Sequence, residues 1–138
     1  MSQLSPIVAV LDDEPEMRKA LRRLLVAKGF RVQVHARGED LLESLSSGLP
    51  HCLLLDLHMP GVNGFDVLAA FASREITTPV VVITGHEEPE TEERVRSFGV
   101  VAYLRKPVDE AILFSAIDAA LSKGASPNTN QNDERKMQ

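Results

Sequence analysis

Short apolar runs alternate with longer amphipathic segments along most of the chain, and this alternation limits the possible folds more than any other feature. The apolar runs, rich in Val, Ile and Leu, lie at residues 7–11, 31–35, 52–56, 79–84 and 101–104. The other segments carry apolar residues at helical spacing, at residues 16–28, 39–45, 65–73, 87–98 and 110–121. Strands that alternate with helices form a parallel sheet covered on both faces, so the sequence predicts a single α/β domain, a doubly wound five-stranded parallel sheet with five helices.

The apolar runs differ in pattern, and the difference predicts their places in the sheet. The runs at 7–11, 52–56 and 79–84 are apolar nearly throughout, as expected of central strands buried on both faces. The run at 31–35 alternates polar and apolar residues, which indicates an edge strand with one wetter face.

Composition and charge exclude several classes of protein. The apolar runs are far shorter than the ~18 residues that a membrane span needs, and residues 1–6 show no basic segment followed by an apolar one, so we expect a cytoplasmic protein without a secretory signal. The net charge of -5 argues against direct nucleic-acid binding and favours a protein partner. The composition becomes polar near the end, so we expect a folded domain over residues 1–122 and a disordered tail or linker remnant over residues 123–138.

Cys52 is the single cysteine of the chain. This excludes disulfides within the chain and cysteine-based zinc sites. Because Cys52 lies in an apolar run, we expect a buried, inert thiol.

The side chains that follow the predicted strands form one chemical set: Asp12, Asp13, Glu14, Asp56, Thr84 and Lys106. The carboxyl ends of parallel strands meet at one edge of a sheet, so these side chains should lie close together. Clustered carboxylates repel one another unless a cation lies among them, and hard oxygen ligands favour Mg²⁺. An ammonium and a hydroxyl beside such a site provide partners for a phosphoryl group, and a carboxylate can serve as its nucleophile.

These residues resemble the receiver domain of two-component response regulators over about residues 7–121. The resemblance rests on Asp12-Asp13, on Asp56 with the following Met59-Pro60-Gly61, on Thr84 and on Lys106-Pro107. The phrases around Met59 and Thr84 are most similar to receivers of the nitrogen-fixation regulator type, which usually precede a DNA-binding domain that these 138 residues do not contain. The resemblance implies a CheY-like (flavodoxin-like) sheet with strand order 2-1-3-4-5.

The resemblance also implies a role for each residue of the site. Asp56 would accept a phosphoryl group from a sensor histidine kinase or a histidine phosphotransfer protein. Asp13 and Asp56 would bind Mg²⁺ directly together with the backbone carbonyl of His58, and Asp12 would hold the metal through water. Lys106 would contact the phosphoryl oxygens.

A switch is implied as well, in which the Thr84 hydroxyl moves onto the phosphoryl group while Tyr103 turns inward. The surface formed by residues 87–98, 101–104 and 110–121 would then change and signal to a downstream effector protein, to a fused output domain or to a second copy in a phosphorylation-dependent homodimer. The Lys106–Pro107 bond is expected to be cis, and Gly85, where many receivers have alanine, should loosen the loop after Thr84.

Several other interpretations stay open at the level of sequence. Asp12 and Asp13 could cap the first helix, since Asp is a common N-cap residue. The chain could be a phosphate-independent pseudo-receiver, or an aspartyl-phosphate phosphohydrolase, although such enzymes typically carry a second acid where this chain has His58. The four histidines match no familiar metal-ligand spacing and are expected at the surface, and the basic residues of the first helix could dock an acidic partner or simply be solvated. These two sets are His35, His51, His58 and His86, and Arg18, Lys19, Arg22 and Arg23.

Overall fold

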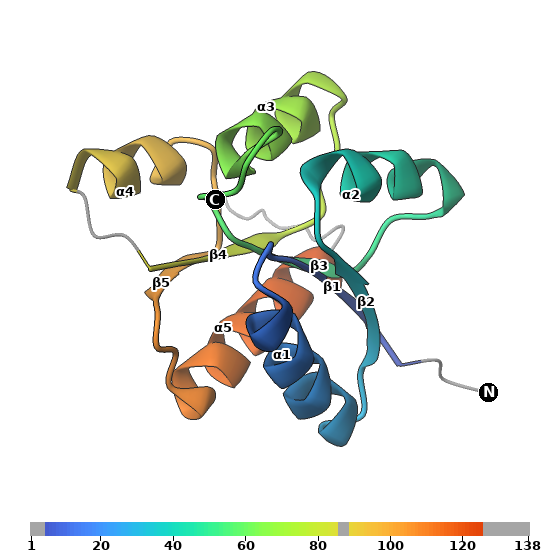
Figure 1. The fold of residues 1–138 in the computed structure, drawn as a ribbon. Helices are drawn as coiled ribbons and strands as arrows, with labels where there is room; N and C mark the ends of the chain where they lie inside the picture. The colour runs from blue at the N-terminus through green and yellow to red at the C-terminus, as the bar shows by residue number, and fades with distance from the viewer. Residues whose placement is uncertain (1–4, 86–88, 126–138) are drawn as a thin grey trace, which may run out of the picture.

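The computed structural model describes residues 5–85 and 89–125, and these residues form a five-stranded parallel sheet between two layers of helices (Figure 1). The strands are β1 (Ile7–Leu11), β2 (Arg31–His35), β3 (Cys52–Leu55), β4 (Val80–Thr84) and β5 (Ala102–Arg105). They pair in the order β2-β1-β3-β4-β5, and every pair is parallel. The expected doubly wound α/β fold and its strand order are confirmed.

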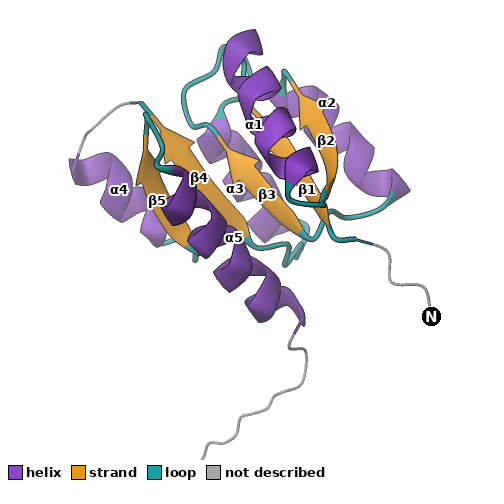
Figure 2. Ribbon diagram, turned by 90° about the horizontal axis from the view of Figure 1, so that it is seen from below, coloured by secondary structure: helices purple, strands orange, loops and turns teal. Residues whose placement is uncertain are grey.

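The helices cover both faces of the sheet, α1 and α5 on one face and α2, α3 and α4 on the other (Figures 1 and 2). They are α1 (Pro15–Ala27), α2 (Gly38–Ser44), α3 (Gly64–Ser73), α4 (Pro89–Arg96) and α5 (Glu110–Ala125), and a short 3-10 turn, η1 (Leu45–Ser47), follows α2. None of the helices in the described part of the chain is both long enough and apolar enough to span a membrane.

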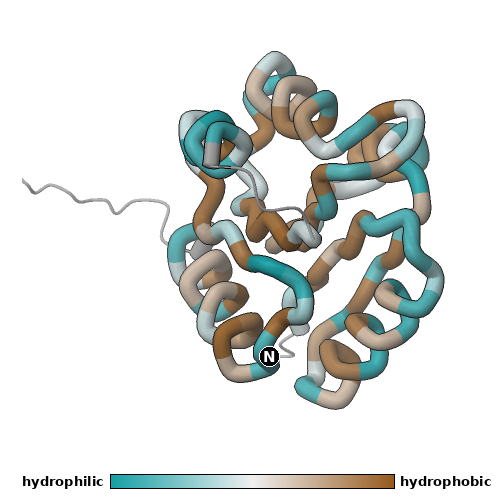
Figure 3. The backbone as a smooth tube through the Cα atoms, turned by 60° about the vertical axis from the view of Figure 1, so that its left-hand side comes forward, coloured by the Kyte–Doolittle hydropathy of each residue, from teal (hydrophilic) through white to brown (hydrophobic). Residues whose placement is uncertain are grey.

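Each face of the sheet has its own hydrophobic core. Leu53, Leu55 and Val82 point toward α2, α3 and α4, whereas Leu54 and Val81 point toward α1 and α5, because successive side chains of a strand alternate between faces. The central strands β1, β3 and β4 are buried almost completely. Figure 3 shows the resulting pattern. The strands are mainly hydrophobic, and hydrophilic and hydrophobic residues alternate along the helices.

The edge position predicted for β2 is confirmed, since β2 pairs only with β1 in the described sheet and all five of its residues are exposed or half-buried. The first helix ends at Ala27, one residue before the predicted end at Lys28, which is its C-cap residue. The next residue, Gly29, has a φ of 94°, a left-handed conformation that glycine adopts without strain. The helix begins one residue earlier than predicted, at Pro15, whose fixed φ suits the first helical position.

Helices α4 and α5 differ from their predicted extents by more than one residue. The helix expected over residues 87–98 is observed as Pro89–Arg96, with residues 86–88 outside the described part of the chain. Helix α5 continues to Ala125 instead of ending at residue 121, and it therefore crosses the expected domain boundary at residue 122. No proline lies between Glu110 and Ala125, so every backbone N–H in this segment remains available for helical hydrogen bonds. The remainder of the predicted tail, residues 126–138, lies outside the described residues.

Candidate functional site

Three aspartates meet where β1 and β3 end. Leu11 pairs with Leu55 in the sheet, so Asp12 and Asp56, the residues that follow them, lie next to each other. Asp13 joins them, and one carboxylate oxygen from each of the three aspartates lies within 4.8 Å of the others. Asp12 and Asp56 are buried, with exposed fractions of 2% and 5%. The sequence prediction that these acids lie together is confirmed.

Backbone hydrogen bonds hold the two buried acids in place. The Asp56 N–H donates to the Leu11 carbonyl at 3.0 Å, and the His58 N–H approaches Asp56 Oδ1 at 3.4 Å. Asp12 Oδ1 accepts a hydrogen bond from the Glu14 N–H at 2.9 Å. The N-cap residue of α1 is Glu14 and makes no side-chain capping bond, so neither Asp12 nor Asp13 occupies the N-cap position that the sequence left open.

Burial and charge make the ionised form of Asp56 unfavourable. Burial is the larger cause, repulsion from Asp12 adds to it, and together they raise the pKa of Asp56 to about 7 despite the attraction of Lys106. A cation that binds beside Asp56 would stabilise its ionised carboxylate. Three carboxylates with hard oxygen atoms are a suitable ligand set for Mg²⁺.

Lys106 supplies the positive charge of the site. Its Nζ lies 3.1 Å from Asp12 Oδ2, 3.0 Å from Glu14 Oε1 and 3.9 Å from Asp56 Oδ2. Burial lowers the pKa of Lys106, but hydrogen bonds to Glu14 and Asp12, together with the negative charges of Asp56 and Asp12, outweigh it, so the pKa lies above its ordinary value. The Lys106–Pro107 bond is cis, as expected.

The sequence predicted that Glu14 and Lys106 lie at the same end of the sheet, but not that their side chains are in direct contact. Glu14 extends the acidic run that ends β1, but adjacency in sequence does not reveal which cation it meets. The contact joins residues 92 positions apart.

Thr84 and Tyr103 lie on neighbouring strands. Thr84 ends β4 and is fully buried, and its carbonyl accepts a hydrogen bond from the Lys106 N–H at 2.9 Å. Tyr103, on β5, is paired with Val82 and packs half-buried against the core under α2, α3 and α4. Because Val82 and Thr84 are two residues apart, Thr84 and Tyr103 belong to the same face of the sheet.

The loop that carries Asp56 is tightly packed against the start of α3. Asn63 and Asp66 form a reciprocal capping box, with each side chain accepting a hydrogen bond of 3.0 Å from the other residue's N–H. A Cβ atom on Gly64 would lie 2.6 Å from the Leu57 Cα, so only glycine fits there. The sequence suggested a helix start at Asn63-Gly64 but not this contact.

The remaining candidates from the sequence have varied surroundings. The prediction that Cys52 is buried is confirmed, and burial raises the pKa of its thiol to about 12, which disfavours the reactive thiolate. The prediction of surface histidines is wrong for His35 and His58, which are partly buried at or near the ends of β2 and β3, each with its Nε2 atom buried. His51 is exposed, and its Nδ1 accepts a hydrogen bond of 3.0 Å from the Ile7 N–H. His86 lies outside the described residues.

The basic residues of α1 do not form a uniform solvated face. Arg18 is half-buried and donates a hydrogen bond of 2.8 Å to the Asp12 carbonyl, so it supports the loop of the acidic site. Lys19, Arg22 and Arg23 are exposed.

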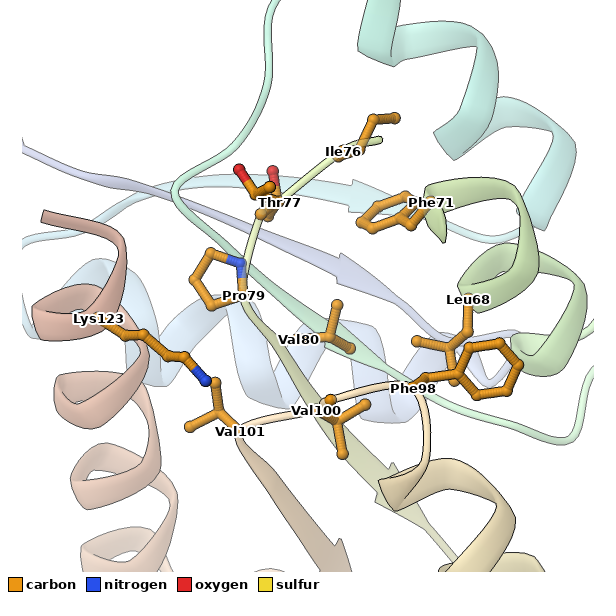
Figure 4. Close-up of a pocket in the computed structure, with 12 residues that line it drawn as sticks. Leu68, Phe71, Ile76, Thr77, Pro79, Val80, Phe98, Val100, Val101 and Lys123 are labelled. Carbon is orange, nitrogen blue, oxygen red and sulfur yellow. The ribbon is translucent and has the colours of Figure 1, made fainter. Parts of the chain in front are cut away.

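A separate cavity of about 520 Å³ lies near the amino ends of β4 and β5, at the opposite end of the strands from the three aspartates (Figure 4). Its walls include Pro79 and Val80 at the start of β4, Val101 before β5, and Lys123 near the end of α5. Phe98, which is 38% exposed, forms part of the rim. None of the three clustered aspartates lines this cavity.

Comparison with known proteins agrees with this geometry. Residues 8–118 match the family described as the response regulator receiver domain. Nodulation protein W of Bradyrhizobium diazoefficiens is 32% identical over 117 residues, which cover 85% of this chain and 52% of that protein. The transcriptional regulatory protein FixJ of Azorhizobium caulinodans is 30% identical over 131 residues, 93% of this chain and 60% of that protein. The chain therefore spans little more than half the length of these relatives.

Solved structures show the same similarity. The crystal structure of FixJ-N has a TM-score of 0.79 and 30% identity, and the match covers 88% of this chain and 96% of that chain. The response regulator StyR has a TM-score of 0.83 and 32% identity, over 89% of this chain and 62% of that chain. Together with the clustered aspartates and Lys106, these matches confirm the resemblance drawn from the sequence motifs. The chain therefore belongs to the response regulator receiver domains, the phosphoacceptor modules of two-component signalling.

Proposed function

We propose that Asp56 is the phosphoacceptor of this receiver and takes its phosphoryl group from a sensor histidine kinase or a histidine phosphotransfer protein. The observation that carries the proposal is the placement of Asp56, a buried carboxylate within 4.8 Å of Asp12 and Asp13 and 3.9 Å from the Lys106 ammonium. A carboxylate oxygen of Asp56 attacks the phosphorus atom of the phosphohistidine. The P–N bond breaks, its electron pair stays on the imidazole nitrogen, and that nitrogen takes up a proton.

The acidic cluster is suited to hold Mg²⁺ during this transfer. Asp13 and Asp56 would bind the ion directly with the backbone carbonyl of His58, and Asp12 would bind it through water. When bound, Mg²⁺ neutralises charge on the transferring phosphoryl group. Support comes from the raised pKa of Asp56, because a site that penalises a carboxylate charge gains from a cation.

Lys106 and Thr84 are proposed to recognise the phosphoryl group after transfer. Lys106 contributes a charge-assisted hydrogen bond, and the Thr84 hydroxyl turns onto a phosphoryl oxygen as Tyr103 moves inward. The surface of α4, β5 and α5 then changes, and it is the proposed contact for a downstream effector, a fused output domain or a second copy. Support comes from the shared sheet face of Thr84 and Tyr103, which lie on the neighbouring strands β4 and β5.

The phosphoacceptor is tested by labelling with acetyl phosphate and Mg²⁺. The wild-type protein should gain a phosphoryl group by intact mass, and Asp56→Asn should not, because an amide is a poor nucleophile. Asp118→Asn, which removes an exposed acid from α5, is the matched control and should label normally. Full labelling of Asp56→Asn would refute the assignment, and an unlabelled wild type would favour a phosphate-independent pseudo-receiver.

The metal ligands are tested by Mg²⁺ titration. Asp13→Ala should weaken binding more than Asp12→Ala, because Asp13 is proposed as a direct ligand and Asp12 as one acting through water. The reverse order would exchange the two roles.

The switch is tested with Thr84→Ala. This variant should still label at Asp56, while the NMR shifts of α4, β5 and α5 respond less to beryllofluoride, a phosphoryl mimic. An undiminished response would show that Thr84 does not couple the site to that surface.

A further inference from the structure

In the unphosphorylated protein, the ammonium of Lys106 is held by acids other than the proposed phosphoacceptor. Its Nζ is within hydrogen-bonding distance of Glu14 at 3.0 Å and of Asp12 at 3.1 Å. The distance to Asp56, 3.9 Å, is too long for a hydrogen bond. The Lys106 ammonium therefore lies closer to the carboxylates of the loop that follows β1 than to Asp56.

The two acids that hold Lys106 differ in exposure. The Asp12 side chain is 3% exposed and lies within the acidic cluster, whereas the Glu14 side chain is 62% exposed and lies at its solvent side. Glu14 is outside the group of acids that could share a metal ion. Its carboxylate can leave Lys106 and be hydrated at little cost, which Asp12 cannot do.

We propose that Glu14 is a positioning residue that retains Lys106 on the solvent side of the site and competes with the phosphoryl group for its ammonium. The inference rests on the proposed function of Asp56. A phosphoryl group on Asp56 adds about -1.5 to -2 charges and three acceptor oxygens, and Lys106 must turn toward them. Glu14 opposes this movement by its hydrogen bond and repels the phosphoryl group by its charge.

The size of the effect follows from the exposure of Glu14. Exposed ion pairs are screened by water, and removing one changes an equilibrium by a factor of up to about five. Glu14 therefore adjusts the affinity for phosphoryl groups without deciding whether they bind.

The test compares Glu14→Gln with Glu16→Gln by titrating beryllofluoride in the presence of Mg²⁺. Glu16 is an exposed acid in the first turn of α1, so both variants change the net charge equally. Glu14→Gln should bind the mimic about two- to fivefold more tightly than the wild type, and Glu16→Gln should not. Equal affinity for the two variants, or weaker binding by Glu14→Gln, would overturn the proposal.

A second variant separates position from charge. Glu14→Asp keeps the carboxylate but shortens the side chain by one methylene, so it should lose the contact with Lys106 and bind the mimic more tightly than the wild type. An affinity equal to that of the wild type would show that charge alone acts, and would overturn the positioning role. Thermal unfolding should be nearly unchanged in both Glu14 variants, whereas a structural role would lower the midpoint. If the wild type binds no mimic at all, the proposed function of Asp56 fails, and the role of Glu14 fails with it.

Discussion

Replacing Asp56 by Asn should stabilise the metal-free protein at neutral and alkaline pH. The ionised carboxylate is buried and lies beside Asp12, and both causes raise its pKa to about 7 in the folded protein. The pKa of the same group in the unfolded chain is near 3.8. Because the unfolded chain releases this proton at lower pH, stability falls as the pH rises from about 4 and levels off above about 7.

The magnitude follows from the interval between the two pKa values. From 3.8 to about 7, at ~1.36 kcal/mol per pH unit, ionisation of Asp56 costs the folded protein about 4 kcal/mol at pH 8. At about pH 5 the Asp56 carboxyl group of the folded protein is still mostly protonated. The same linkage relation then gives a loss of stability of only about 2 kcal/mol. An amide of the same shape avoids this cost, so the stabilisation of Asp56→Asn should be larger by roughly 2–3 kcal/mol at pH 8 than at pH 5.

Urea denaturation with EDTA measures this difference. At pH 8 the midpoint of Asp56→Asn should exceed that of the wild type by roughly 2 M, for a typical slope of about 2 kcal/mol per molar urea. Asp118→Asn removes an exposed acid from α5 and should change the stability by less than about 0.5 kcal/mol. If Asp56→Asn is no more stable than the wild type, or if its advantage is the same at both pH values, the reasoning from burial and repulsion is refuted.

Three further outcomes follow from packing and burial. Gly64→Ala places a Cβ atom 2.6 Å from the Leu57 backbone and should lower the stability measured by thermal unfolding by about 1–3 kcal/mol. In the control Gly85→Ala, the new Cβ atom meets only a Lys106 side-chain carbon at 3.8 Å, and the stability should change by less than about 0.5 kcal/mol. Equal losses of stability in the two variants would contradict the packing argument. Asn63→Ala removes the side-chain acceptor of the α3 capping box and should cost about 0.5–2 kcal/mol by the same measurement. Cys52, with its pKa raised to about 12, should resist a thiol reagent at pH 8 until the protein is unfolded in urea, and rapid labelling of the folded protein would show that the thiol is accessible.

Much of the fold could be predicted because its signals are local. Strand β2 alternates in polarity and lies at the edge, while β1, β3 and β4 are continuously apolar and lie in the centre. The extent of α5 was less predictable, because the sequence has no proline near residue 121 to end the helix there, and the helix continues through Gly124 to Ala125.

The sequence alone determined the chemistry of the site, because parallel strands place the residues after them at one edge. Asp12, Asp56 and Lys106 each follow a strand, so their proximity required only the order of the elements. Only the tertiary structure decided how deeply each charged group is buried and which acids contact Lys106. The pKa of Asp56 depends on how deeply its carboxylate is buried. The pairing of Lys106 with Glu14 depends on a distance of 3.0 Å between residues that are 92 positions apart in the sequence. No local sequence pattern encodes the burial or the distance.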